Sequence, residues 1–295
     1  MAAPAGEQAQ LLARHDGVRI AYRRSEARRP AGRAPVLLLH GLASNMTRWS
    51  EFVERTTLDE DRDVVRVDLR GHGASPTRGR ISLELWSDDL LALLDSLAAP
   101  RALLVGHSLG AQVALACASR APQRVAALVL IDPVFRPALR GRWKWLARAA
   151  PLFVAAAALV RGLNALGLRR QRIPPLDLRA LDALARESLG SPEAEAEFIR
   201  RYSSTRADLR TFRTAHYLQE LVEMFRAVAA PESVAVPTLV LLSTGATFAD
   251  LDAMRQIAAR FPRGEVRLIE CHHWPLTERP DEVRRTIEDW CGRQP

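Results

Sequence analysis

The chain has 295 residues, of which 48% are hydrophobic and 26% charged. This composition excludes an intrinsically disordered chain, and the length suits one large α/β domain or a core with an inserted lobe. The formal net charge is +8, but acidic residues are interleaved with the basic ones and no DNA- or RNA-binding module is visible. We therefore expect a solvated basic surface and no nucleic-acid partner.

The three cysteines, Cys117, Cys271 and Cys291, are too few and too scattered for a disulfide framework or a four-ligand zinc site. Their number favours a reducing compartment. Residues 1–12 have neither the basic flank nor the long apolar segment of a secretory signal, and no apolar run is long enough to cross a bilayer. A cytoplasmic location is expected.

Short apolar segments rich in β-formers alternate with segments of helical period in both end regions of the chain. Residues 17–24, which follow an Asp-Gly turn, predict antiparallel edge strands. The later alternation predicts a doubly wound, mostly parallel sheet of buried strands. The predicted parallel strands are 36–40, 64–68, 102–105, 128–132, 238–243 and 266–270, and the predicted helices are 82–97, 109–119, 251–261 and 281–290.

The alternation stops after Asp132. Residues 134–231 read as Ala-, Leu- and Arg-rich helices separated by prolines, which predicts a helical cap inserted between two parts of a core, 1–133 and 232–295. The apolar segment 143–160 is expected to roof a pocket and pack on its own core. Its flanking arginines leave contact with an anionic membrane as the alternative.

The most informative motif is Gly106-His107-Ser108-Leu109-Gly110, which follows a predicted strand and opens a predicted helix. This G-x-S-x-G pattern predicts a nucleophile elbow, a strained turn that projects the serine above the sheet. The two glycines let strand and helix approach each other closely. Ser108 is therefore the candidate nucleophile.

A second strand ends in a glycine turn at His40-Gly41-Leu42, at the sheet edge where open α/β folds bind ligands. Acyl transfer needs two donors that are already aimed at the oxyanion of the tetrahedral intermediate. The backbone N–H groups of Leu42 and Leu109 are the candidates, the latter at a helix N-terminus. For His40 we expect a structural hydrogen bond within this loop.

Together with the segments 68–75 and 271–280, these motifs resemble the α/β-hydrolase superfamily, in its subgroup with a cap after the sixth strand. The resemblance covers nearly the whole chain except the cap. It implies that the 68–75 segment is a structural turn near the site, so that His72 is not catalytic. It also implies an H-x-P histidine after the last strand, which selects His273 rather than His272 as the base.

The resemblance places the triad acid in a G-x-x-D segment, but here that segment reads Gly245-Ala246-Thr247-Phe248. Asp250 and Asp132 remain as candidates, and the absence of any functional acid is the third alternative. Some members, notably the haloalkane dehalogenases, carry the acid after the earlier strand. Asp132 is preferred because it leaves its strand at the same sheet edge as Ser108.

Cys271, His272 and His273 are consecutive residues leaving a strand, so they cannot converge on one metal ion, and neither metal nor cofactor is expected. Ser108 argues against haloalkane dehalogenases and epoxide hydrolases, which need a carboxylate nucleophile. Tyr202 and Tyr217 are then interpreted as packing or pocket-lining residues. For Trp49 and Trp274 an apolar acyl pocket and the ordinary core both remain open.

These observations predict a serine hydrolase that cleaves a hydrophobic ester, lactone or thioester through Ser108, His273 and Asp132. The expected partner is a small hydrophobic acyl substrate. C–C bond hydrolysis is one alternative. The missing G-x-x-D acid motivates another, a receptor-like binding protein that retains the hydrolase pocket but turns over poorly.

Overall fold

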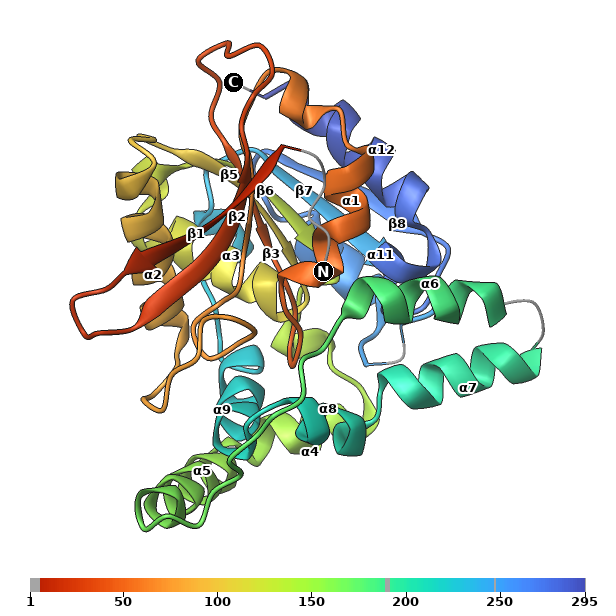
Figure 1. Cartoon of the computed structure of the whole chain (residues 1–295). Helices are drawn as coiled ribbons and strands as arrows, with labels where there is room; N and C mark the ends of the chain where they lie inside the picture. Colours follow the sequence, from red (N-terminus) through yellow and green to blue (C-terminus); the bar gives the residue numbers. More distant parts are fainter. Residues whose placement is uncertain (1–5, 189–191, 247, 295) are drawn as a thin grey trace.

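The computed structural model describes residues 6–188, 192–246 and 248–294, and these residues form an eight-stranded sheet with helices on both faces (Figure 1). The strand order is β1-β2-β4-β3-β5-β6-β7-β8. The pairs β1–β2 and β2–β4 are antiparallel and the others are parallel. The strands are β1 Glu7–Ala13, β2 Arg19–Ser25, β3 Val36–Leu39, β4 Val64–Val67, β5 Ala102–His107, β6 Val125–Ile131, β7 Thr238–Ser243 and β8 Gly264–Ile269.

The central strands β3, β5 and β6 are buried along their whole length, as continuous apolar runs in a parallel sheet should be. Helices α2, α3 and α10 contribute to the hydrophobic core on one face, and α1 and α12 to the core on the other. The helices outside the cap are α1 Ser50–Arg55, α2 Leu83–Ser96, α3 Leu109–Arg120, α10 Leu251–Ala258, α11 Pro275–Glu278 and α12 Pro280–Cys291.

The sheet confirms the predicted α/β class, with two differences in detail. The strand predicted at 266–270 is not buried, because β8 is the last strand of the sheet and Leu268 is 42% exposed. The Asp-Gly turn joins two strands, so β1 extends the antiparallel edge to residue 7, beyond the segment predicted there.

Between β6 and β7 the chain forms helices α4 to α9, which lie below the sheet in Figure 1. We call residues 134–231 the cap segment. Its helices are α4 Gly141–Arg148, α5 Ala150–Ala165, α6 Leu178–Ser188, α7 Pro192–Tyr202, α8 Thr205–Thr211 and α9 Thr214–Met224.

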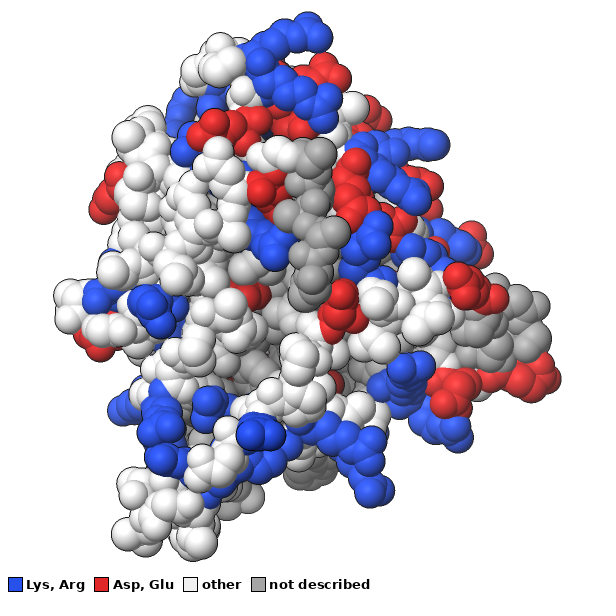
Figure 2. Space-filling view, in the orientation of Figure 1, with Lys and Arg blue, Asp and Glu red and all other residues white. Residues whose placement is uncertain are grey.

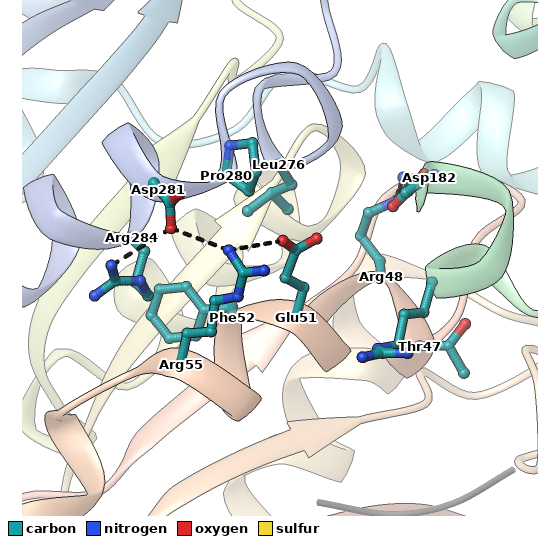
Figure 3. A pocket seen from close by; sticks show the side chains of 11 residues that line it. Thr47, Arg48, Glu51, Phe52, Arg55, Asp182, Leu276, Pro280, Asp281 and Arg284 are labelled. Atoms are coloured by element: carbon teal, nitrogen blue, oxygen red, sulfur yellow. Dashed lines mark hydrogen bonds and ion pairs between the residues drawn. The ribbon is translucent and has the colours of Figure 1, made fainter. Parts of the chain in front are cut away.

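Polar contacts attach α6 to the core. The Asn45 side chain donates to the Leu176 carbonyl at 2.8 Å, and the Leu178 amide donates to Thr47 Oγ1 at 3.0 Å. Arg48 and Asp182 form a buried ion pair with an N–O distance of 2.5 Å. Figure 3 shows this pair beside more exposed charges of α1 and α12. The cavity between them is about 10 Å³, room for little more than one water molecule, so it is a packing seam.

The apolar segment 143–160 packs only partly as expected: Ala147 of α4 lies in the hydrophobic core, but α5 leaves much of its surface exposed. The segment forms α4 and most of α5, and α5 lies against α9 rather than under the sheet. Ala157 is buried on α5, whereas Leu152 is 72% exposed and Leu159 66%. No single helix in the described residues is long and apolar enough to cross a membrane; α4 and α5 together meet that length and composition, but they are bent by 59°.

Candidate active site

Ser108 sits in a strained turn between β5 and α3, with φ of 52° and ψ of −112°. A Cβ atom at Gly106 would lie 2.3 Å from the carbonyl oxygen of Gly110, and one at Gly110 would lie 2.4 Å from the carbonyl oxygen of Leu39. Both positions therefore require glycine. The turn fixes the serine at the carboxyl edge of the sheet, as the G-x-S-x-G motif predicted.

The structure brings Ser108, His273 and Asp132 together. His273 Nδ1 lies 3.2 Å from Asp132 Oδ2, and its Nε2 lies 3.2 Å from Ser108 Oγ. Because an ionised carboxylate only accepts hydrogen bonds, Nδ1 carries the proton and Nε2 is free to accept from the serine hydroxyl. Ser108 and Asp132 are buried, while the His273 side chain remains 24% exposed.

Asp132 is held rigidly at the end of β6, where its φ is 45°. The amide of Ser243 donates to Asp132 Oδ1 at 2.7 Å, and the Ser243 hydroxyl donates to Oδ2 at 2.6 Å. The Cys271 thiol in turn contacts Ser243 Oγ at 3.2 Å. Neighbouring strand ends thus orient the carboxylate toward His273.

Asp250, the other candidate acid, lies elsewhere. Its carboxylate caps α10 by accepting from the Ala253 amide at 2.8 Å, and it forms an ion pair with Arg140. Phe248 fills the expected acid position, and its ring packs edge-on against His273 with centroids 4.6 Å apart. The loop after β7 therefore gives His273 an apolar neighbour rather than a charged one. Thr247 lies outside the described residues.

The neighbouring histidines have different contacts. His272 Nδ1 lies 2.9 Å from Glu278 Oε2, away from Ser108. His107 Nε2 lies 3.1 Å from the carbonyl oxygen of His273. Burial lowers the pKa of His107 to about 3, so its ring is neutral and donates to that carbonyl. His107 supports the His273 loop, a role that its variable position in G-x-S-x-G does not reveal.

His107, Asp132 and His273 lie as close together as the ligands of a metal site, because their potential ligand atoms are all within 4.8 Å of one another. Each side chain is already engaged. Asp132 accepts from Ser243 and faces His273 Nδ1, and His107 binds the His273 carbonyl. A hydrogen-bonded relay accounts for the cluster.

The loop after β3 lies next to Ser108, since a Cβ atom at Gly41 would be 3.5 Å from Ser108 Cβ. In the described part of the chain, no hydrogen-bond acceptor contacts the backbone N–H of Leu42 or of Leu109. Leu109 is the first residue of α3, whose N-terminal dipole favours negative charge. Two backbone donors are thus free near the serine.

The segment 68–75 supports this loop. Asp68 Oδ1 accepts from the Met46 amide at 2.7 Å and Oδ2 accepts from the Ala74 amide at 2.7 Å. His40 Nε2 accepts from the Leu69 amide at 3.1 Å, so the proton is on Nδ1, which faces the Gly41 carbonyl. Burial lowers the pKa of His40 to about 3. These contacts are structural, as expected for His40.

Glu220 of α9 extends from the cap segment to the same loop. Its Oε2 accepts from the Ala43 amide at 2.9 Å, and its Oε1 contacts His72 Nε2. His72 Nδ1 faces the carbonyls of Leu69 and Arg70, so it carries the proton and leaves Nε2 bare. Burial raises the pKa of Glu220 well above its usual value, and the protonated carboxyl can donate to His72 Nε2.

Glu220 was not identified from the sequence. Its place in an ordinary amphipathic helix gives no sign that it is completely buried beside the loop carrying Leu42. It ties the cap segment to the turn that presents one of the free backbone donors.

Aromatic side chains lie beside His273. Trp274 lies with its ring centroid 6.0 Å from that of His273, and it packs against Phe198 and Tyr202 of α7. Trp49 is fully buried in the core against Phe52 and does not line the site. Of the two tryptophans considered from the sequence, only Trp274 is beside the catalytic candidates.

Both tyrosines of the cap segment have packing roles. The Tyr202 hydroxyl donates to Asp182 at 2.8 Å. Tyr217 belongs to a small buried cluster with Ala43 and Phe212, and its hydroxyl contacts Thr205.

Comparison with known proteins gives matches in sequence and in fold. A stretch of 101 residues is 42% identical to a dihydrolipoyllysine-residue acetyltransferase component of the acetoin cleaving system of Pseudomonas putida, over 34% of this chain and 27% of that protein. The match thus spans only about a quarter of that relative. The sn-1-specific diacylglycerol lipase of Mus musculus is 26% identical over 268 residues, 85% of this chain and 79% of the lipase.

Among solved structures, the enol-lactonase of Burkholderia xenovorans LB400 superposes with a TM-score of 0.67 at 20% identity, covering 96% of this chain and all of that one (100%). The family model for the alpha/beta hydrolase fold matches residues 34–280. This match includes strands β3 to β8 and every motif at the carboxyl edge. The chain therefore belongs to the α/β hydrolase fold family, whose members are hydrolases.

Proposed function

We propose that this protein is a cofactor-independent serine hydrolase that cleaves a hydrophobic carboxylic ester or a closely related acyl compound. The observation that carries the proposal is the continuous contact from Ser108 Oγ through His273 to Asp132 Oδ2. A buried carboxylate, an imidazole with a fixed tautomer and a serine at a strained turn are the parts of an acyl-transfer site.

In the first half-reaction, Ser108 Oγ attacks the acyl carbon and its proton passes to His273 Nε2. Asp132 stabilises the imidazolium that forms. The N–H groups of Leu42 and Leu109 donate to the oxyanion of the tetrahedral intermediate. The C–O bond then breaks, and the leaving alkoxide takes the proton from Nε2.

In the second half-reaction, His273 accepts a proton from water as the water attacks the acyl–Ser108 ester. The second tetrahedral intermediate uses the same two backbone donors. Its collapse releases the carboxylic acid, and the proton on Nε2 returns to Ser108 Oγ.

The surroundings of the site support an apolar acyl substrate. Phe248 and Trp274 both pack against the His273 ring, and Phe198 packs on Trp274. The lipase and lactonase relatives act on acyl–oxygen bonds, which is consistent with this substrate class. The receptor-like alternative was motivated by the missing G-x-x-D acid, and the position of Asp132 beside His273 Nδ1 supports the hydrolase proposal over it.

A fluorophosphonate probe and a panel of esters test the proposal together. We expect the probe to label Ser108, with no labelling in Ser108→Ala, and p-nitrophenyl esters to be hydrolysed with a preference set by acyl length. Lactones, thioesters and β-diketones in the same panel separate ester hydrolysis from C–C cleavage. A folded protein that neither reacts with the probe nor turns over any member of the panel would be a binding protein instead.

A further inference from the structure

The outer face of α5 carries no charge at all. Amphipathic helices normally expose polar side chains, but every exposed position between Pro151 and Ala165 is apolar or glycine. The helix has 16 residues and is therefore about 24 Å long. The exposed residues are Pro151, Leu152, Val154, Ala155, Ala158, Leu159, Gly162, Leu163 and Ala165.

Exposed apolar residues also lie beyond both ends of α5. On α4, the Trp145 side chain is 70% exposed, and the Arg148 guanidinium lies over its ring at 5.4 Å. Beyond α5, Leu166 is 80% exposed and Leu168 is 69% exposed. An exposed apolar surface of this extent in a folded protein marks an interaction site.

All formal side-chain charge in this part of the chain is positive. Residues 133–176 include nine Arg or Lys residues and none of the chain's 34 Asp and Glu residues. Figure 2 shows basic side chains beside the uncharged end of the molecule that Figure 1 identifies as α5. Whatever covers the apolar face should therefore be negatively charged around its apolar part.

A basic pocket lies next to the inner side of α5. It is a cavity of about 870 Å³ between α5, α9 and the segment 167–173. Its lining includes five arginines and no carboxylate, namely Arg78, Arg161, Arg169, Arg170 and Arg213. Burial, together with the neighbouring Arg78, Arg169 and Arg170, lowers the pKa of Arg213.

The arginines of the basic pocket are not neutralised within the described residues. Arg170 donates only to backbone carbonyls, those of Leu209, Arg210 and Phe212. Arg161 Nη1 is buried and has no hydrogen-bond partner among the described residues. An oxyanion such as a phosphate would satisfy these donors.

We propose that α4 and α5 dock on an anionic phospholipid surface, with the apolar face of α5 in the acyl–headgroup boundary and a lipid phosphate in the basic pocket. A helix with a wide apolar face and cationic flanks binds such surfaces through apolar burial and attraction to acidic headgroups. Trp145, an amphipathic aromatic side chain, suits the same depth.

A second copy of the chain is a poorer occupant. A two-fold contact through α5 would place the same patch on both sides, so the surrounding arginines would face one another. Like charges across an interface oppose association. A lipid surface instead offers both the apolar layer and the negative charge.

Vesicle co-sedimentation of the full chain tests the proposal without any substrate, so its outcome is independent of the proposed hydrolase activity. We expect at least about tenfold more binding to phosphatidylcholine vesicles containing about 30% phosphatidylglycerol than to phosphatidylcholine alone. Binding should weaken when the salt is raised from about 0.1 M to about 0.5 M.

Two pairs of variants locate the contact. Leu159→Glu should reduce binding about tenfold, whereas Leu184→Glu on α6, at a site with 58% exposure, should not. Replacing Arg161, Arg169 and Arg213 together by Gln should have a larger effect than replacing the exposed Arg29, Arg263 and Arg285, although each trio removes three charges. Circular dichroism and Tm check that each variant is folded.

Three results would overturn the proposal. In the first, Leu159→Glu and Leu184→Glu bind anionic vesicles equally, and so do the two arginine trios. Inorganic phosphate could raise Tm while no vesicle binds, which would make the basic pocket a site for a soluble anion. Sedimentation velocity could reveal a dimer that Leu159→Glu dissociates in the absence of vesicle binding, which would assign the face to a second copy.

Discussion

The carboxyl edge of the sheet and the cap segment are held by different kinds of contact. At the sheet edge, close backbone approach at Gly106 and Gly110 and buried hydrogen bonds at Asp132 leave little freedom. The cap segment joins the core through apolar side chains of α4 and α9 as well as through polar contacts such as the pair of Arg48 and Asp182. One of its helices leaves its apolar face open. The difference separates a rigid candidate active site at the sheet edge from a cap segment that can vary in shape and in binding partner.

The largest effect should come from the rigid region. Ser108→Ala removes the attacking oxygen but keeps a side chain small enough for the elbow, so turnover should fall by about 10⁴-fold or more while Tm stays near that of wild type. Ester hydrolysis and thermal melting measure the two quantities. Activity within about tenfold of wild type would eliminate the serine mechanism.

The next effect distinguishes the two candidate acids. Asp132→Asn should lower kcat by up to about 10⁴-fold, because the amide can no longer stabilise the imidazolium and favours the wrong tautomer of His273. Asp250→Asn is the matched control, since Asp250 only caps α10 and pairs with Arg140. Its kcat should stay within about tenfold of wild type. If Asp250→Asn lowered kcat more than Asp132→Asn, the triad acid would be Asp250, in the loop after β7.

In the cap segment, stability should respond more than chemistry. Asp182→Asn leaves the buried Arg48 guanidinium without its counterion, which should cost about 3 kcal/mol and lower Tm by several degrees. Asp281→Asn in the same seam removes a partner of the exposed Arg55, so its cost should be below about 1 kcal/mol (Figure 3). Equal shifts in Tm would mean that α6 does not depend on the buried pair.

The smallest effect concerns the contact that joins the two regions. Burial raises the pKa of Glu220 well above its usual value, so the folded protein holds the carboxyl proton to a higher pH than the unfolded chain does. Its contribution to stability is therefore present below the unfolded pKa and is lost as pH rises. Glu220→Gln cannot titrate, so the variant's Tm should rise by a few degrees relative to wild type as the pH is raised above the ordinary glutamate pKa of 4.5.

Melting curves of both proteins at several pH values provide this comparison. The side-chain amide of the Glu220→Gln variant would retain an acceptor for the Ala43 backbone N–H and gain a donor for His72 Nε2, so folding should be preserved. A Tm difference that does not change with pH would show that the Glu220 and His72 pair binds no proton in this range.

The sheet could be predicted because each central strand can be recognised from its own short segment of sequence. The continuous apolar runs predicted as strands at 36–40 and 128–132 alternate with helical segments, as buried parallel strands do, and they correspond to β3 and β6. The elbow was equally predictable, since Gly106 and Gly110 are required by contacts within one strand–turn–helix unit. Strand β1 was harder to predict from the sequence, because its residues are exposed or half-buried without a regular alternation.

The rest of the candidate site depends on packing between distant segments. Asp132 could be favoured but not assigned, since its orientation comes from the Ser243 hydrogen bonds across the β6–β7 pair. Burial of Glu220 depends on where α9 meets the loop after β3. Apolarity alone also failed for α5, because an apolar segment is equally compatible with a buried helix and with one that awaits a partner.

The position of Asp132 has a consequence for how this scaffold can be altered. With the proposed acid at the end of β6, the loop after β7 is relieved of a catalytic residue. Its contacts include Phe248 on His273, the bridge between Leu139 and Ala249, and the Asp250 carboxylate on Arg140. Insertions there should be tolerated in protein engineering as long as these contacts survive. Grafting a different cap is more demanding, because the graft would begin immediately after the residue that orients the base.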